Sequence, residues 1–200
     1  MKALEEILHD IRACRLCENE LPHEPRPVLR ASSTARICIV GQAPGTRVHQ
    51  SGLPFTDPSG DRLRAWMGID SATFYDQSQI AIVPMGFCFP GLDAKGGDLP
   101  PRRECAAHWR KPLFEALPRF ALTLVIGTYA QKWHLAEAFA GTLTETVRSW
   151  RANLPDFLPL PHPSWRNNAW LKRNPWFERD VIPYLRDRVA SELNACHAKL

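Results

Sequence analysis

The sequence lacks any long hydrophobic run, and this absence excludes one large class of protein. No stretch of its 200 residues approaches the ~20 consecutive apolar residues that a membrane-spanning helix needs. Residues 1–10 carry acidic side chains within an apolar pattern, which indicates an amphipathic helix and not a secretory signal. We therefore expect a cytoplasmic protein that does not enter a membrane.

The sequence also has no internal repeat, no low-complexity tract and no Gly-x-x-x-x-Gly-Lys loop. The absence of that loop argues against a protein that acts on a free nucleotide. Apolar residues make up 44% of the chain and charged residues 23%, which is typical of a folded domain, and the length suits a single domain over residues 1–200. The net charge of +4 is compatible with a polyanionic partner but does not require one.

Short apolar runs alternate with helical patterns along the chain. The runs predict four strands, over residues 36–40, 80–83, 122–126 and 157–160. Helices are expected over residues 2–13, 61–67 and 128–140, from residue 101 until Pro112 bends or ends it, and after an Asn174-Pro175 N-cap with a kink at Pro183. This alternation predicts an α/β fold with a parallel central sheet.

Four connecting segments each follow a predicted strand. These segments are residues 41–55, 84–88, 127–128 and 162–167. In parallel sheets, ligands bind beyond the carboxyl ends of the strands, so we expect the four segments to meet at one edge and form one site.

Four of the six cysteines stand at informative spacings: Cys14, Cys17, Cys88 and Cys105. In a cytoplasmic protein they indicate ligands for zinc or an iron–sulfur cluster more than a disulfide framework. Zinc sites built from four cysteines usually use two C-x-x-C pairs, and only Cys14 and Cys17 form one here, which favours a cluster. Two other interpretations stay open, because C-x-x-C also suits redox chemistry and Cys88 and Cys105 could be buried packing residues, as we expect for Cys38 and Cys196.

Three further motifs occur in order with these cysteines: Gly41-Gln-Ala-Pro-Gly45, Gly52-Leu-Pro-Phe55 and His162-Pro-Ser164. From about Cys14 to Leu185 the chain resembles the uracil-DNA glycosylase superfamily, in particular its iron–sulfur branches, families four and five. The resemblance implies a three-layer αβα sandwich around a short, mainly parallel four-stranded sheet. It also implies a monomer that acts on damaged DNA and holds a structural [4Fe–4S] cluster through Cys14, Cys17, Cys88 and Cys105, with zinc as the alternative metal.

The chain departs from the family pattern at several positions. Gln42 stands where the fourth branch has an acid after the first loop glycine, and Pro84 stands where members of that branch usually have an asparagine that grips the uracil edge. Thr46 and Arg47 occupy positions that are often acidic, so Asp57 is the nearest candidate for the water-activating acid. Two functions follow: a glycosylase that removes uracil or a related deaminated base, or a catalytically silent nucleic-acid-binding member without the acid.

The chemistry of base removal assigns roles to the residues of these motifs. A neutral His162 can donate a hydrogen bond to the departing base, and Gln42 can hold the base edge or orient water. Asp57 can activate water or stabilise the cationic sugar. The predicted base-binding residues, which include a stacking aromatic and loop backbone groups, are Gly41, Ala43, Phe55 and Ser164. Each has a plainer interpretation, as a surface, turn or core residue.

A polar and aromatic segment after His162 predicts the DNA contacts. Arg166, Asn167 and Lys172 carry the groups that bind phosphates, and Trp165 could fill the space that a flipped base leaves. Trp170 and Trp176 are expected to pack around the last helix, and such packing stays open as the alternative for Trp165. The Gly-rich segment 91–97 is read as a mobile loop and is assigned no chemistry.

Overall fold

The computed structural model describes residues 3–197, with side chains described through residue 195. Its sheet has four strands: β1 (Ile37–Val40), β2 (Ile80–Ile82), β3 (Leu122–Ile126) and β4 (Phe157–Leu160). Their order is β2-β1-β3-β4, and every pairing is parallel. The four predicted strands are confirmed to within one residue at each end, and the sheet is wholly parallel.

Nine α-helices surround the sheet over the described residues 3–197. They are α1 (Leu4–Arg12), α2 (Thr46–Ser51), α3 (Pro58–Met67), α4 (Ser71–Phe74), α5 (Arg103–Ala116), α6 (Gly127–Leu135), α7 (Leu143–Arg148), α8 (Asn168–Arg173) and α9 (Ile182–His197). Short 3-10 turns occur at Glu18–Glu20, Ala136–Ala138, Trp150–Asn153 and Trp165–Asn167, and a π-helical turn occurs at Phe177–Val181. None of the helices in this described part is long and apolar enough to cross a bilayer.

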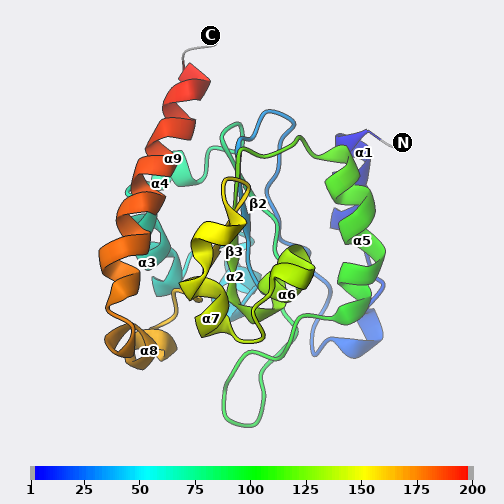
Figure 1. The fold of residues 1–200 in the computed structure, drawn as a ribbon. Helices are drawn as coiled ribbons and strands as arrows, with labels where there is room; N and C mark the ends of the chain where they lie inside the picture. The colour runs from blue at the N-terminus through cyan, green and yellow to red at the C-terminus, as the bar shows by residue number, and fades with distance from the viewer. Residues whose placement is uncertain (1–2, 198–200) are drawn as a thin grey trace.

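The sheet is covered on both faces, as Figure 1 shows with α3, α4 and α9 on one side and α1 and α5 on the other. Alternate residues of β1 enter separate cores because successive strand side chains point to opposite faces. Ile37 and Ile39 belong to the core that includes residues of α3 and α9. Cys38 and Val40 belong to the core under α1, α5 and α6, so Cys38 is a packing residue, as predicted. The expected three-layer αβα sandwich is therefore confirmed.

Several local predictions need correction. The segment 41–55 contains helix α2, in which Val48 is the one buried residue and apolar periodicity is absent. Pro112 does not end helix α5, which continues for four more residues to Ala116. Arg110 and Leu113, before and after the proline, are both buried, so packing holds the helix on both sides of Pro112. Helix α6 ends at Leu135, where Ala136 takes a φ of 45°, and a 3-10 turn replaces the rest of the predicted helix.

The start of the last helix also differs from the prediction. Asn174 is not its side-chain cap, because its amide oxygen accepts from the Trp176 indole and its amide nitrogen donates to the Trp170 carbonyl. The chain instead enters α9 through the π-helical turn Phe177–Val181, directly before Pro183. Trp170 and Trp176 pack against the core, as predicted. The side chain of Cys196 lies outside the described residues.

Candidate active site

A pocket opens at the carboxyl edge of the sheet, where segments far apart in sequence meet. The segments that follow β1, β2 and β4 all reach it, whereas residues 127–128 do not line it. Its lining includes Gly41, Gln42, Ala43, Phe55, Asp57, Pro84, Asp98 and His162. We call this the base pocket. It brings together all three predicted catalytic residues and three of the four predicted base-binding residues.

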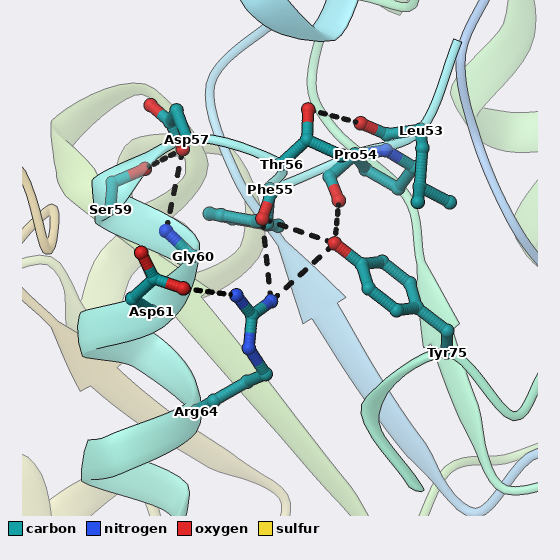
Figure 2. Close-up of polar contacts among 10 residues, drawn as sticks. All are labelled: Leu53, Pro54, Phe55, Thr56, Asp57, Ser59, Gly60, Asp61, Arg64 and Tyr75. Carbon is teal, nitrogen blue, oxygen red and sulfur yellow. Dashed lines mark hydrogen bonds and ion pairs between the residues drawn. The ribbon is translucent and has the colours of Figure 1, made fainter. Parts of the chain in front are cut away.

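Phe55 lies on the wall of this pocket in an unusual backbone conformation. Its φ is 57°, in the left-handed region that non-glycine residues seldom adopt. Figure 2 shows what holds it there: the Phe55 carbonyl accepts from the Arg64 guanidinium at 3.3 Å and lies 3.1 Å from the Tyr75 hydroxyl. The Phe55 ring packs edge-on against Phe74, with ring centroids 6.0 Å apart. Neighbouring side chains therefore fix a strained aromatic beside the pocket.

Gly60 allows the chain to approach Phe55 closely. A Cβ at residue 60 would lie 1.8 Å from the Phe55 carbonyl oxygen, so no larger residue fits without a backbone shift. At Gly41, by contrast, a Cβ would make an ordinary contact with the Phe55 ring at 3.6 Å. Phe55 can therefore keep its position only if residue 60 is glycine, whereas residue 41 has room for a Cβ.

Asp57 is the N-cap of α3, and this role engages part of its carboxylate. Its Oδ1 accepts from the Ser59 hydroxyl at 2.6 Å and from the Gly60 backbone N–H at 3.3 Å (Figure 2). Pro58 then occupies the first helical position, where its missing N–H costs nothing. Asp57 thus faces the pocket while one of its oxygens stabilises the helix terminus.

His162 lines the base pocket from the segment after β4. Burial lowers the pKa of the His162 imidazole, while the nearby Asp57 carboxylate acts in the opposite direction. The lowered pKa favours the neutral imidazole at neutral pH, a form that can still donate a hydrogen bond. Its backbone is held by Asn167, whose side-chain amide donates to the His162 carbonyl at 2.7 Å.

An outer groove continues from the base pocket toward the predicted DNA contacts. Its lining consists of Gln42, Ala43, Asp98, Leu99, His162, Ser164, Arg166 and Asn167. Ser164 belongs to this groove and not to the lining of the base pocket. Trp165 is 69% exposed. Lys172 is exposed on α8 and lines neither hollow.

Asp98 is a site residue that the sequence analysis missed. It lines both the base pocket and the outer groove, and it directly follows the Gly-rich segment 91–97, to which the sequence analysis assigned no chemistry. The sequence analysis also missed Arg64 and Tyr75, which donate to the Phe55 carbonyl from α3 and from the end of α4. No local motif marks any of the three, because each acts through a contact between distant segments.

The four predicted cysteine ligands line a second, separate cavity. Cys14, Cys17, Cys88 and Cys105 share it with apolar residues such as Leu16, Leu21 and Phe87 and with Arg102. We call this the cysteine cavity. No group of three or more His, Cys, Asp or Glu side chains within residues 3–195 is placed to hold one metal ion.

Hydrogen-bond donors and burial define the surroundings of these sulfurs. The Trp109 indole N–H lies 3.2 Å from the Cys14 Sγ, and the Phe87 backbone N–H lies 3.5 Å from the Cys105 Sγ. Burial raises the pKa of Cys88 to about 11 and that of Cys105 to about 12. A donor set of four thiols, with N–H groups aimed at two of them and an apolar lining, fits an iron–sulfur cluster chemically.

The base pocket and the cysteine cavity share one short wall. Pro84 lines the former, and Gly86, Phe87 and Cys88 line the latter. The wall is bonded to the first loop, since the Met85 N–H donates to the Gly41 carbonyl at 2.9 Å and the Gly86 N–H donates to the Gln42 carbonyl at 3.0 Å.

The buried Arg110 braces this wall from α5. It is 1% exposed and donates to the Pro84 carbonyl at 3.0 Å, and it also contacts the His134 ring nitrogen. Burial lowers the pKa of His134 to about 3, so this histidine is neutral beside the guanidinium. Helix α5, which carries Cys105, is thereby tied to the wall of the base pocket.

The comparison with known families agrees with this arrangement. The family model of the uracil DNA glycosylase superfamily matches residues 30–186, which is more than half of the chain. The chain belongs to the uracil-DNA glycosylase superfamily. The matched residues include every residue that lines the base pocket except Val28, together with Cys88 and Cys105.

Cys14 and Cys17 precede the matched residues, so the superfamily match carries no information about the first half of the cysteine set. Membership indicates an activity of the glycosylase type, with DNA as the substrate polymer.

Proposed function

We propose that this member of the uracil-DNA glycosylase superfamily hydrolyses the N-glycosidic bond of uracil, or of a related deaminated base, flipped out of DNA. One observation carries the proposal. A neutral His162, a strained Phe55 and the amide of Gln42, from segments up to 120 positions apart, line a single pocket in this superfamily's fold. A pocket of this kind suits one extruded base.

Within the pocket each side chain has a distinct task. The ring of Phe55 stacks on the base, and Gln42 can hydrogen-bond the base edge because its amide both donates and accepts. As the C1′–N bond breaks, negative charge develops on the base, and the His162 N–H donates to a carbonyl oxygen of the base. Asp57, beside the pocket, stabilises the positive charge that develops on the sugar.

The outer groove provides the path for the DNA strand next to the flipped nucleotide. Arg166, Asn167 and the Ser164 hydroxyl are groups of the kind that bind phosphates. The exposed Trp165 can enter the space that the base leaves in the duplex. Lys172, which is exposed on α8 outside this groove, is a further cation for the phosphates of the DNA.

For the cysteine cavity we propose a [4Fe–4S] cluster held by Cys14, Cys17, Cys88 and Cys105. The cluster would cross-link the N-terminal segment, the wall at residues 84–88 and α5, and so would have a structural role. The four thiols that line one apolar cavity and the N–H groups near Cys14 and Cys105 support this proposal, with zinc as the alternative metal.

The decisive experiment uses duplex and single-stranded oligonucleotides that carry one uracil, hypoxanthine or xanthine and an end label. After incubation with the protein, alkali cleaves any abasic site. We expect a strand break at uracil or at a related deaminated base, and we expect His162→Ala to lose about 100-fold or more of the single-turnover rate. His9→Ala, an exposed histidine on α1, is the matched control and keeps the wild-type rate.

Two outcomes contradict the proposal. If none of the bases is released while salt-sensitive DNA binding persists, the protein is a silent binding member of the superfamily. If bases are released and His162→Ala is as fast as wild type, the central assignment of the pocket is wrong.

A further inference from the structure

The segment that carries Asp98 folds back on itself beside the base pocket. Leu92 and Asp98 form an antiparallel bridge, and the Leu99 N–H donates to the Gly91 carbonyl at 2.9 Å. Inside the turn, the Asp93 carboxylate accepts from the backbone N–H groups of Lys95 and Gly97, each at 2.8 Å. Residues 91–99 are thus a hydrogen-bonded turn, and Asp98 has a defined position at its base.

A contact across the outer groove anchors this turn to the segment that carries His162. The Arg166 guanidinium donates to the Gly96 carbonyl at 3.0 Å. On the opposite side, the Asp98 carboxylate lies over Gly45 of the first loop, where a Cβ would be 3.6 Å from its nearer oxygen. Asp98 therefore stands between the first loop and the His162 segment, where the base pocket meets the outer groove.

The two carboxylates of the pocket differ in how they are engaged. Asp57 uses an oxygen to cap α3, whereas the Asp98 carboxylate accepts no hydrogen bond from residues 3–195. Desolvation raises the pKa of Asp98, the charges of Asp57 and Asp93 add to this effect, and Arg166 opposes it. An acid that is free of hydrogen bonds and holds a proton more readily than usual is suited to accept one.

We propose that Asp98 is the catalytic residue that accepts the proton of the attacking water, in place of the acid that the first loop lacks. This inference rests on the proposed glycosylase function. The water oxygen forms a bond to C1′ and its O–H bond electrons return to oxygen as the proton passes to Asp98. The C1′–N bond breaks with its electron pair going to the base, which then takes a proton from solvent.

The position of Asp98 predicts that removing its charge changes DNA binding and the rate of base release in opposite directions. A carboxylate in the same groove as Arg166 repels the phosphates that the groove must bind. Removing its charge should therefore strengthen binding while it slows the reaction. A residue with only a structural role in the turn would not separate these two effects.

The test compares Asp98→Asn with wild type in two assays. Single-turnover base release from the substrate that wild type cleaves should fall about 100-fold or more, as expected when a general base is lost. Affinity for an undamaged duplex of the same sequence, measured by fluorescence anisotropy, should equal or exceed that of wild type. Asp187→Asn, an exposed acid on α9, controls for net charge and should keep the wild-type rate.

A second variant separates the carboxylate from the shape of the turn. Asp93→Ala removes the acceptor of two backbone N–H groups but keeps the Asp98 carboxylate and does not touch the backbone bond between Leu99 and Gly91 at the base of the turn. We expect its rate to fall less than about 10-fold. If it falls as far as that of Asp98→Asn, or if Asp98→Asn stays within about 3-fold of wild type, the inference is overturned.

The failure of this inference can be told apart from the failure of the proposed function. If wild type releases no base, both are overturned. If wild type is active and His162→Ala is not, while Asp98→Asn is as active as wild type, the glycosylase function stands and only the role of Asp98 is lost.

Discussion

The base pocket and the cysteine cavity lie on opposite sides of one wall, but they are held together in different ways. In the base pocket, the carbonyl groups of Phe55 and His162 and the Asp57 carboxylate all accept hydrogen bonds from this chain. In the cysteine cavity, four thiols face an apolar hollow, and burial raises the pKa of Cys17, Cys88 and Cys105.

The difference teaches how each site obtains its shape. The polypeptide's own hydrogen bonds determine the shape of the base pocket. Substitutions that disturb these backbone contacts should therefore distort the pocket. The cysteine cavity places buried sulfurs where the charged thiolate is unfavourable without a cation nearby. Its stability should therefore depend on the proposed metal group, whose binding free energy adds to that of folding.

The largest effect is expected from Cys88→Ser combined with Cys105→Ser. The variant should lose its iron and its visible absorption, and it should melt about 10 °C or more below wild type, because a structural metal site stabilises the folded state. Iron and sulfide analysis of protein purified anaerobically, followed by thermal unfolding, provides the measurement.

Cys38→Ala is the matched control for that variant, since Cys38 packs inside β1 and lines neither site. It should retain iron and lose only about 1 kcal/mol for the small group removed from the core. Wild-type protein that is colourless and binds one zinc ion per chain would contradict the proposed cluster.

Gly60→Ala should damage the base pocket and leave the cysteine cavity intact. The new Cβ would lie 1.8 Å from the Phe55 carbonyl oxygen, so the backbone must shift, at a cost of about 3 kcal/mol in the free energy of unfolding. Urea unfolding measures this cost, and iron content should match wild type.

For comparison, a Cβ at Gly41 would make only an ordinary contact, 3.6 Å from the Phe55 ring. The stability of Gly41→Ala should therefore lie within about 1 kcal/mol of wild type. If the two alanine variants are equally stable, the close approach at Gly60 does not hold Phe55 in place.

The smallest effect on stability is expected from Trp165→Ala. The side chain is 69% exposed, so unfolding should change by less than about 0.5 kcal/mol. DNA binding should weaken by about 10-fold if the indole contacts the bases, because one such stacking contact is worth roughly 1–3 kcal/mol. Anisotropy with a duplex that carries an abasic site measures this loss.

Trp133→Ala is the control, since Trp133 is 49% exposed on α6 and lines neither the base pocket nor the outer groove. Its affinity for DNA should match that of wild type. Equal weakening in both variants would mean that exposed indoles bind DNA without regard to the groove.

The sequence predicted most of the fold because the signals were local. Each strand is a short apolar run that is buried on both faces, and such runs stand out between Gly, Pro and polar residues. Helix α2 escaped because it has a single buried residue and no apolar periodicity. Its one usable signal was Gly52, which ends the helix with a φ of 71°.

The candidate site was predictable only in part. His162, Phe55 and Gln42 stand in motifs that resemble a known family, and the structure places all three around one pocket. Asp98 stands in a Gly-rich turn with no motif, and Arg110 lies mid-helix like many surface arginines. Both act through contacts across the chain, at Gly45 and at Pro84, and sequence spacing carries no measure of such distances.

By itself, the sequence determined the four strands, the two-sided burial of the sheet and the segments that follow each strand, because apolar periodicity and turn residues act over a few neighbouring positions. Only the tertiary structure decided which acid faces the pocket entrance and what holds Phe55 in a left-handed conformation. Those features depend on hydrogen bonds and packing between segments tens of residues apart, and these form only once the sheet has brought the segments together.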